Sequence, residues 1–433
     1  MVPIKNNRKS TYVKSVIKAE LTEKNIRVRI AAVILLIVLA SGAFAYALSS
    51  YFSSEPGWVT IQAEASSGRN CSNEFVFMYC IGAGGASATL EKKALISLYT
   101  AAAVKAYQLF NNDEIFVGVK NIAYINKHPN EVIEVDEVLY NAFSLLDRYN
   151  CRSLYLAPVY AEYDNMFAYE DDFQIAAYDP FRNDEIRSYY AEVATFASSY
   201  DAINIELLGE NRIMLRVSAD YQKYAAEHGI TDYIDFFWMK NAFIIDYIAN
   251  VMIDNNYTLG SISSYNGFVR NLDGSGNIYS YHLYDRVGNT VYPAGVMKYT
   301  GPQSIVYLRN YRMTELDNQY YYELTDGETR TSFIDIADGL CKSSKNDFVC
   351  YSKEHGCAEI LLQMIPVYIT DTFREEALAS LAGNAIYAVY CEDSVIYYND
   401  SRLTISDLYE DENVTYTTLN VQTVVFKNVR KTH

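Results

Sequence analysis

The chain has 433 residues, half of them hydrophobic, and carries 36 basic against 53 acidic side chains, a net charge of −17 at pH 7. Removing the eight basic and two acidic side chains of the first 29 residues leaves 28 and 51, so the remainder has a net charge of −23. This charge repels nucleic acid and anionic lipid headgroups, which excludes both as partners of the folded part.

The N-terminal segment predicts a membrane anchor. The first 29 residues are basic, and the 25 residues from Ile30 to Ser54 contain no charge. About 20 apolar residues in a helix span a bilayer, and positive charge stays on the cytoplasmic side. We therefore expect a cytoplasmic tail at 1–29, a transmembrane helix at 30–52 and an extracytoplasmic domain at 58–433, in a single-pass protein of the cell membrane. A signal peptide cleaved after Ala43-Phe44-Ala45 is the alternative, and it exports the same domain.

Hydrophobic periodicity predicts helices and strands in an irregular order. In chain order we expect strands at 58–62 and 75–79, a helix at 91–110, an extended stretch turning into a helix within 129–147, strands at 202–207 and 212–217, a helix at 238–255, strands at 261–265, 278–282 and within 303–336, a strand at 359–369, a helix at 371–382, a hairpin at 385–398 and a last strand at 414–426. The elements interleave without βαβ regularity, which favours an α+β domain with a mainly antiparallel sheet.

All seven cysteines follow the apolar run, where an oxidising compartment favours disulfides. Cys71 and Cys80 are close enough in sequence for a hairpin bridge, and the cluster of Cys341, Cys350 and Cys357 allows another. The odd number leaves at least one thiol without an intramolecular partner. No CxxC occurs, so a zinc site is not expected.

The 41 tyrosines are the most unusual feature of the composition. Tyrosine favours strands and half-buried surfaces, so most of these side chains are expected to fill a sheet, and a sugar-binding surface is the functional alternative. The sequence contains no GxxxxGK[ST], GxSxG or HExxH motif, and Gly82-Ala-Gly-Gly85 is interpreted as a plain turn.

Several weak matches recur in a fixed order. Asp235 and Asp246 lie eleven residues apart in a helical segment, and Asn266-Gly267 follows. Then come Phe333-Ile-Asp335-Ile-Ala-Asp-Gly339 and an apolar run that ends at Asp371. This order and spacing, from Tyr107 to Ala382, resembles the ApbE family, the FAD:protein FMN transferases that act on exported flavoproteins.

The resemblance implies a site. It assigns cofactor binding to Asn266, Gly267, Asp335 and Gly339, and metal binding to Asp371 and Glu375. The last two would lie four residues apart on one helical face, where carboxylate oxygens suit a hard cation. The implied cofactors are FAD and Mg²⁺ if the family site is retained and none otherwise; no catalytic residue is assigned.

The chain departs from the family pattern at three points. Asn241-Ala242 stand for its Lys-Gly pair, Ser332 for its His, and Glu375 for its metal-binding Thr. We therefore favour a catalytically degenerate ApbE-like protein, a membrane-anchored binding or scaffold module with its cleft filled by side chains. The alternative is an active, Mg²⁺-dependent FAD:protein FMN transferase that modifies Thr or Ser of exported flavoproteins. The second alternative is an unrelated exported Tyr-rich domain that binds a glycan or another surface protein.

Overall fold

The computed structural model describes residues 54–85, 87–169, 171–314, 317 and 320–421. The described part from Glu55 onward belongs to one compact unit. Among these residues, no helix is both long and apolar enough to cross a bilayer. The predicted tail at 1–29 and the predicted transmembrane helix at 30–52 lie outside the described residues.

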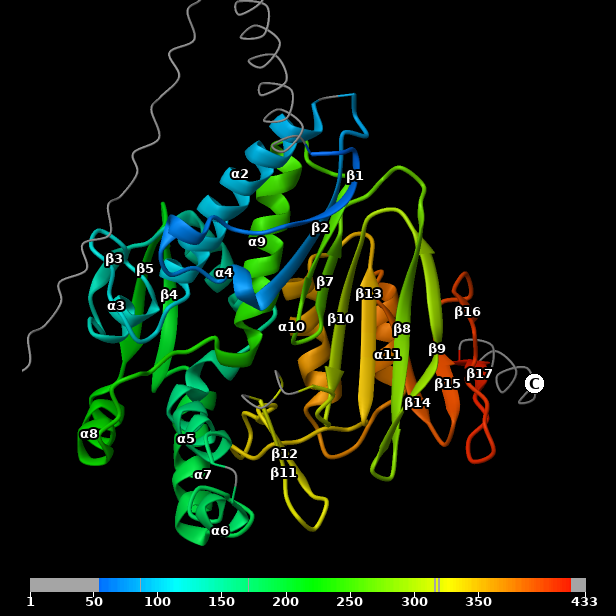
Figure 1. The fold of residues 1–433 in the computed structure, drawn as a ribbon. Helices are drawn as coiled ribbons and strands as arrows, with labels where there is room; N and C mark the ends of the chain where they lie inside the picture. The colour runs from blue at the N-terminus through cyan, green and yellow to red at the C-terminus, as the bar shows by residue number, and fades with distance from the viewer. Residues whose placement is uncertain (1–53, 86, 170, 315–316, 318–319, 422–433) are drawn as a thin grey trace, which may run out of the picture. The chain divides into compact units, whose positions relative to one another are not determined.

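A nine-stranded sheet forms the centre of this unit (Figure 1). Every neighbouring pair is antiparallel except β15 and β17, which are parallel, so the predicted mixed and mainly antiparallel fold is confirmed. In spatial order the strands are β1 (Gly57–Ile61), β2 (Phe75–Ile81), β6 (Gly260–Ser264), β7 (Phe268–Asn271), β10 (Gln303–Arg309), β13 (Asp347–Ser352), β14 (Tyr387–Glu392), β15 (Val395–Tyr398) and β17 (Thr417–Asn420).

The sheet is covered on both faces, and its strands alternate accordingly. In β10, Val306 and Leu308 join the core under the helices, while Ile305 and Tyr307 join a second core on the opposite face. The helical layer contains α2 (Ala88–Leu109), α9 (Lys240–Asp254), α10 (Cys357–Tyr368) and α11 (Glu376–Gly383). The second core is closed by a three-stranded sheet of β16 (Thr404–Ser406), β9 (Thr290–Thr300) and β8 (Ile278–Val287).

Residues 122–228 add a mostly helical region beside the sheet, visible on the left of Figure 1. Its small antiparallel sheet has the order β3-β5-β4. Its elements are α3 (Ile122–Asn126), β3 (Val132–Glu134), α4 (Glu137–Arg148), α5 (Ala157–Phe167), α6 (Asp172–Ile175), α7 (Asp184–Ser198), β4 (Ile203–Gly209), β5 (Arg212–Val217) and α8 (Ala219–His228). A separate hairpin pairs β11 (Tyr321–Glu323) with β12 (Thr329–Thr331).

Local signals account for α4. Asp136 caps the helix by accepting a hydrogen bond from Val138 N at 3.0 Å. Its buried side chains, Leu139, Ala142, Phe143 and Leu146, follow the 3,1,3 spacing of one helical face. The prediction within 129–147 is therefore confirmed, including the extended stretch that becomes β3.

The predicted strand at 359–369 is wrong, because this segment is the helix α10. The helix is buried against α9, β10 and β13, so nearly all of its faces are apolar and no helical period is visible in the sequence. The helix expected from Asp371 begins only at Glu376. Helices α5, α7 and α8 were not predicted.

The predicted disulfides are not formed: all seven cysteines are free thiols. Cys71 Sγ donates to the carbonyl of Ala103, 3.3 Å away, and burial raises the pKa of this thiol to about 12. Cys80 pairs with Trp58 in the β1–β2 ladder instead of reaching Cys71.

Candidate functional site

Asn266 and Gly267 form the tight turn between β6 and β7. Gly267 has a φ of +101°, and a Cβ added to it would collide with the carbonyl oxygen of Tyr307. Tyr307 N donates to Gly267 O at 2.9 Å, and Asn241 Nδ2 donates to Asn266 Oδ1 at 3.3 Å. The glycine is thus required by the approach of the chain's own backbone, and the turn is connected to the start of α9.

Asp335 and Gly339 close a second turn. Gly339 N donates to Asp335 O at 2.8 Å, and Asp335 Oδ1 accepts a bond from Ala337 N at 2.9 Å. Gly339 has a φ of +75°, and a Cβ added there would lie 2.7 Å from the carbonyl oxygen of Tyr190 in α7. This second glycine is likewise explained by close packing within the chain.

Lys342 gathers three carboxylates around its ammonium group. Its Nζ lies 2.9 Å from Asp335 Oδ2, 2.8 Å from Asp338 Oδ2 and 3.1 Å from Asp371 Oδ2. Burial lowers the pKa of Lys342, but the hydrogen bonds to the three acids outweigh it and raise this pKa overall. Two predicted site residues, Asp335 and Asp371, are therefore brought together, and a lysine lies between them.

The predicted helical geometry of Asp371 and Glu375 is wrong. Asp371 is exposed and lies in the bend after α10, whereas Glu375 is the residue at the N-cap of α11. In the described part of the chain, no group of three or more His, Cys, Asp or Glu side chains is arranged to hold a metal ion. Since Lys342 already supplies the positive charge, Mg²⁺ does not fit this pair as it stands.

Asp371 and Glu375 were expected on a helix that follows a strand. The structure has this arrangement earlier in the chain, where the strand β13 is followed by the helix α10. Glu359 and Gln363 lie one turn apart on α10, and Tyr149 contacts both: its hydroxyl donates to Glu359 Oε1, and Gln363 Nε2 donates to the Tyr149 oxygen at 3.3 Å. His355 Nδ1 lies 2.8 Å from Glu359 Oε2, and Asn384 Nδ2 donates to Gln363 Oε1 at 2.7 Å. This network was missed because its segment was predicted as a strand; the E-x-x-x-Q spacing would have indicated it on a helix.

The chain's own groups therefore satisfy the oxygens that face this network. Burial raises the pKa of Glu359, but the hydrogen bonds from Tyr149 and His355 outweigh it and lower this pKa overall. Arg148 Nη1 lies 3.8 Å from the same carboxylate. A cation would have to displace these donors, so Mg²⁺ does not fit here as the side chains lie.

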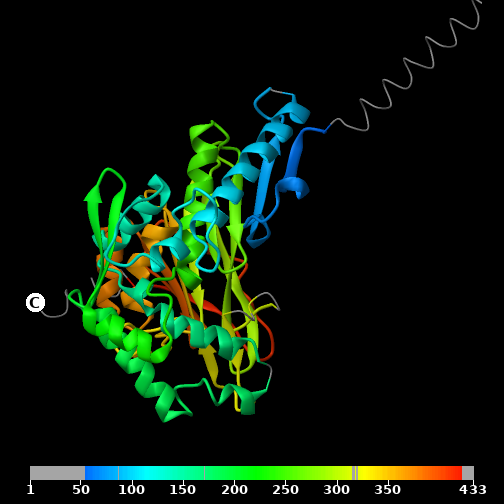
Figure 2. The same cartoon turned by 90° about the vertical axis from the view of Figure 1, so that its left-hand side faces the viewer.

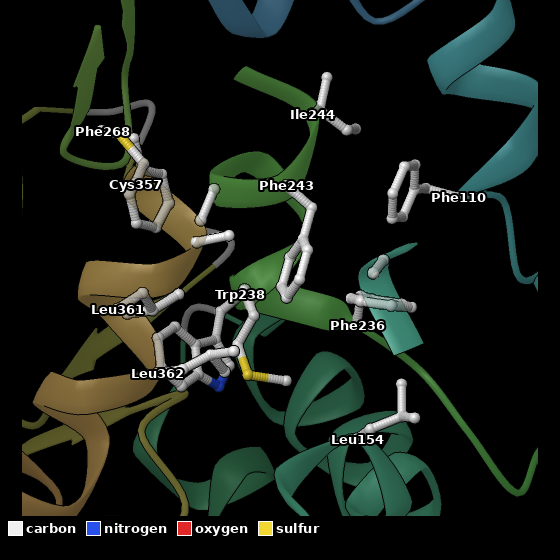
Figure 3. Packing of buried hydrophobic residues seen from close by; sticks show 14 of the residues in the cluster. Phe110, Leu154, Phe236, Trp238, Phe243, Ile244, Phe268, Cys357, Leu361 and Leu362 are labelled. Carbon is white, nitrogen blue, oxygen red and sulfur yellow. The ribbon is translucent and has the colours of Figure 1, made fainter. Parts of the chain in front are cut away.

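Aromatic rings pack closely around the N-terminal end of α9 (Figure 3). The Trp238 ring lies edge-on to Phe333 at a centroid distance of 5.0 Å, and the Phe236 ring lies 5.1 Å from Phe110 and 4.9 Å from Phe243. Trp238 is only 3 % exposed. These packed rings leave no room for FAD between them, in the segment that carries the Asp235–Asp246 spacing of the resemblance.

Asp235, which directly precedes this aromatic segment, is a partly buried carboxyl without an ion-pair partner among the described residues. It accepts hydrogen bonds from Asn112 Nδ2 at 2.9 Å and from Phe237 N at 2.8 Å. Burial nevertheless raises its pKa to about 7. The carboxyl therefore titrates near neutral pH.

A cleft of ≈ 690 Å³ lies elsewhere, between α4, α9, the ends of β7 and β10, and the start of α10. At its floor Arg270 Nη1 lies 2.9 Å from Asp246 Oδ1, and this carboxylate accepts the backbone N–H groups of Cys357 and Ala358, each at 2.8 Å. Burial raises the pKa of Asp246, while Arg270 opposes the shift. None of the six predicted site residues lines this cleft.

Comparison with solved structures identifies the fold. The chain matches the ApbE protein of Thermotoga maritima with a TM-score of 0.51 and 12 % identity, over 82 % of this chain and 97 % of that one. It matches a point mutant of the flavin transferase ApbE of Vibrio cholerae with a TM-score of 0.50 and 13 % identity, over 82 % and 98 %. No family model and no curated protein matches the sequence.

The domain therefore has the fold of ApbE flavin transferases, and the resemblance seen in the order of its motifs is confirmed at the level of fold.

Proposed function

We propose that the protein is a membrane-anchored, extracytoplasmic relative of the flavin transferases that acts as a binding or scaffold module and not as an enzyme. The observation that carries this proposal is the ammonium of Lys342, which lies 3.1 Å from Asp371, one of the two acids to which the resemblance assigns the metal. The oxygens of Glu359 are likewise engaged, by a hydrogen bond from Tyr149 and by His355 Nδ1 at 2.8 Å. A carboxylate already paired with a fixed internal cation has little to gain from Mg²⁺.

The aromatic packing supports the same proposal. Trp238 and Phe236 fill space beside α9 with rings that cannot leave without opening the core. At Gly267 and Gly339 the protein's own backbone lies so close that a Cβ would not fit. These contacts support a closed flavin site in this chain, whose partner would be an exported flavoprotein or another protein at the membrane surface.

The test is a titration of the full-length protein with FAD, with and without Mg²⁺, followed by flavin fluorescence and by transfer of FMN to a Thr-containing acceptor peptide. We expect neither saturable quenching nor transfer, while a flavin transferase assayed in parallel shows both. Saturable, Mg²⁺-dependent binding would overturn the proposal. Carbonate extraction of membranes tests the anchor: a protein held by residues 30–52 stays in the pellet.

An active FMN transferase is the second candidate, and one observation favours it. Glu359 and Gln363 lie one turn apart on α10, the helix that follows β13. The resemblance implies the same arrangement for the metal ligands, two residues one turn apart on a helix that follows a strand. In this case Tyr149 and His355 release Glu359 when the cation arrives. The same titration decides, because Glu359→Gln then abolishes the Mg²⁺-dependent binding and Asp371→Asn does not.

A further inference from the structure

We propose that the cleft beside Arg270 is a binding site for an uncharged saccharide. Its volume of ≈ 690 Å³ lies within the roughly 300–1,000 Å³ of small-molecule sites in proteins. None of the six residues to which the resemblance assigns a cofactor or a metal lines the cleft, although Asp246 of the same motif order and Glu359 of the second candidate function do.

An orphaned donor lies in the wall of the cleft. Gln303, the first residue of β10, is 3 % exposed, and its Nε2 has no hydrogen-bond partner among the described residues. A buried amide without a partner costs about 1–3 kcal/mol, and a ligand oxygen would recover this cost. The other buried polar groups of the same wall are bonded: Asn271 Nδ2 donates to Gly301 O at 3.0 Å, and Ser304 Oγ to His355 O at 2.6 Å.

The charges of the cleft argue against an ionic ligand. Three cations and three anions line it, apart from His355: Arg148, Arg270, Lys353, Asp246, Glu354 and Glu359. Arg270 is paired with Asp246, and Arg148 lies beside Glu359. Although most of the chain carries a net charge of −23, the cleft is balanced, so it attracts neither an anion nor a cation strongly.

Two of the groups left free are neutral amides that bond in both directions. Asn141 on α4 and Asn250 on α9 are exposed in the cleft and make no side-chain hydrogen bond to described residues. An amide both donates and accepts, which matches the hydroxyl groups of a sugar. The half-buried ring of Tyr247 also lines the cleft and suits the C–H face of a sugar ring.

The sheet disfavours a peptide as the occupant. Extended peptides usually bind by adding a strand to an open sheet edge. The strands that end in the cleft, β7 and β10, are interior strands, each paired on both sides. The cleft therefore offers a peptide backbone no unpaired edge.

A second hollow extends the site. It measures ≈ 450 Å³ and shares Gln303, Lys353 and Glu354 with the cleft. Tyr299 and Tyr387 line it, and the guanidinium of Arg402 covers the Tyr387 ring at 5.0 Å. Two adjoining hollows with Gln303 in the shared wall fit a disaccharide or a longer glycan better than a single sugar ring.

The test uses saturation-transfer NMR on the full-length protein with four probes: lactose and N,N′-diacetylchitobiose as neutral saccharides, lactobionate as a charged counterpart, and N-acetyl-trialanine amide as a neutral peptide. We expect transfer to at least one neutral saccharide. The Gln303→Leu variant should bind it about ten-fold more weakly, because one hydrogen bond is lost. Gln174→Leu on α6 is the matched control and should bind as the wild type does.

Gln303→Leu should not unfold the protein, because the side chain has no hydrogen bond to lose among the described residues; circular dichroism checks this. Asn250→Leu, at the exposed rim, gives a second and milder loss of binding. The proposal is overturned if no neutral saccharide binds, if lactobionate or the peptide binds more tightly, or if saccharide binding survives both substitutions in the cleft.

Discussion

The acidic cluster around Lys342 and the cleft beside Arg270 contain the same kinds of side chains and use them differently. In the first, one ammonium satisfies Asp335, Asp338 and Asp371. In the second, Arg270 and Asp246 are also paired, but the amide of Gln303 remains without a partner among the described residues. A group of carboxylates is therefore not by itself a binding site. A buried donor or acceptor without a partner in the protein is the better indication of a ligand.

Breaking the ion pair at the floor of the cleft should have the largest effect. Arg270→Met leaves Asp246 buried without its cation, and we expect a loss of about 3–5 kcal/mol in the free energy of unfolding, measured with urea. The double variant Arg270→Met/Asp246→Asn should recover much of this loss, since no buried charge then remains. Equal destabilisation of the single and the double variant would contradict the argument.

The pH dependence of stability should reveal Asp235, the partly buried carboxyl that has no ion-pair partner among the described residues. Its pKa is raised by burial to about 7, so the folded state holds a proton that the unfolded state releases near pH 4. Its contribution is thus fully present below pH 4 and is lost as pH rises through 7, by up to about 4 kcal/mol. Urea unfolding of Asp235→Asn should show a flatter profile between pH 5 and 8; an unchanged slope would mean that Asp235 is ionised throughout.

Removing the ammonium group of Lys342 should leave the three acids around it without a counter-charge. Lys342→Met should lose about 2 kcal/mol of stability, because three carboxylates then repel one another without a counter-charge. Millimolar Mg²⁺ or Ca²⁺ should raise the unfolding temperature of the variant but not that of the wild type. Lys345→Met, which removes an ion pair with Glu392, is the control and should show no such rise.

The smallest effect is expected at the Glu359 network. Tyr149→Phe removes one hydrogen bond to the carboxylate and should cost about 1 kcal/mol at neutral pH. Because the pKa of Glu359 is lowered in the folded state, this stabilisation is present above the unfolded pKa and is lost as pH falls through the folded value. The two proteins should therefore converge in acid. A constant difference down to low pH would place the effect in packing, and Tyr140→Phe on α4 should be nearly neutral throughout.

More of the fold than of the candidate site could be predicted from the sequence. Elements whose pattern is local, such as α2, α4, the β4–β5 hairpin and the β14–β15 hairpin, lie within a few residues of their predicted bounds. The helix α10 could not be recognised, since burial on nearly every side removes the helical period. Because of that error, the network of Glu359 and Gln363 was not recognised in the sequence.

The sequence by itself determined the class of fold, the strong negative charge and the order of the motifs that resemble ApbE flavin transferases, because these depend on composition and on neighbours along the chain. The membrane anchor and the roles of the six predicted site residues stay predictions. Only the tertiary structure decided that Lys342 lies among three acids, that aromatic rings pack closely around the N-terminal end of α9, and that Gln303 faces a cleft without a partner among the described residues. Such facts depend on which donors and acceptors residues far apart in the chain bring within 3 Å of one another, and a linear pattern does not contain that information.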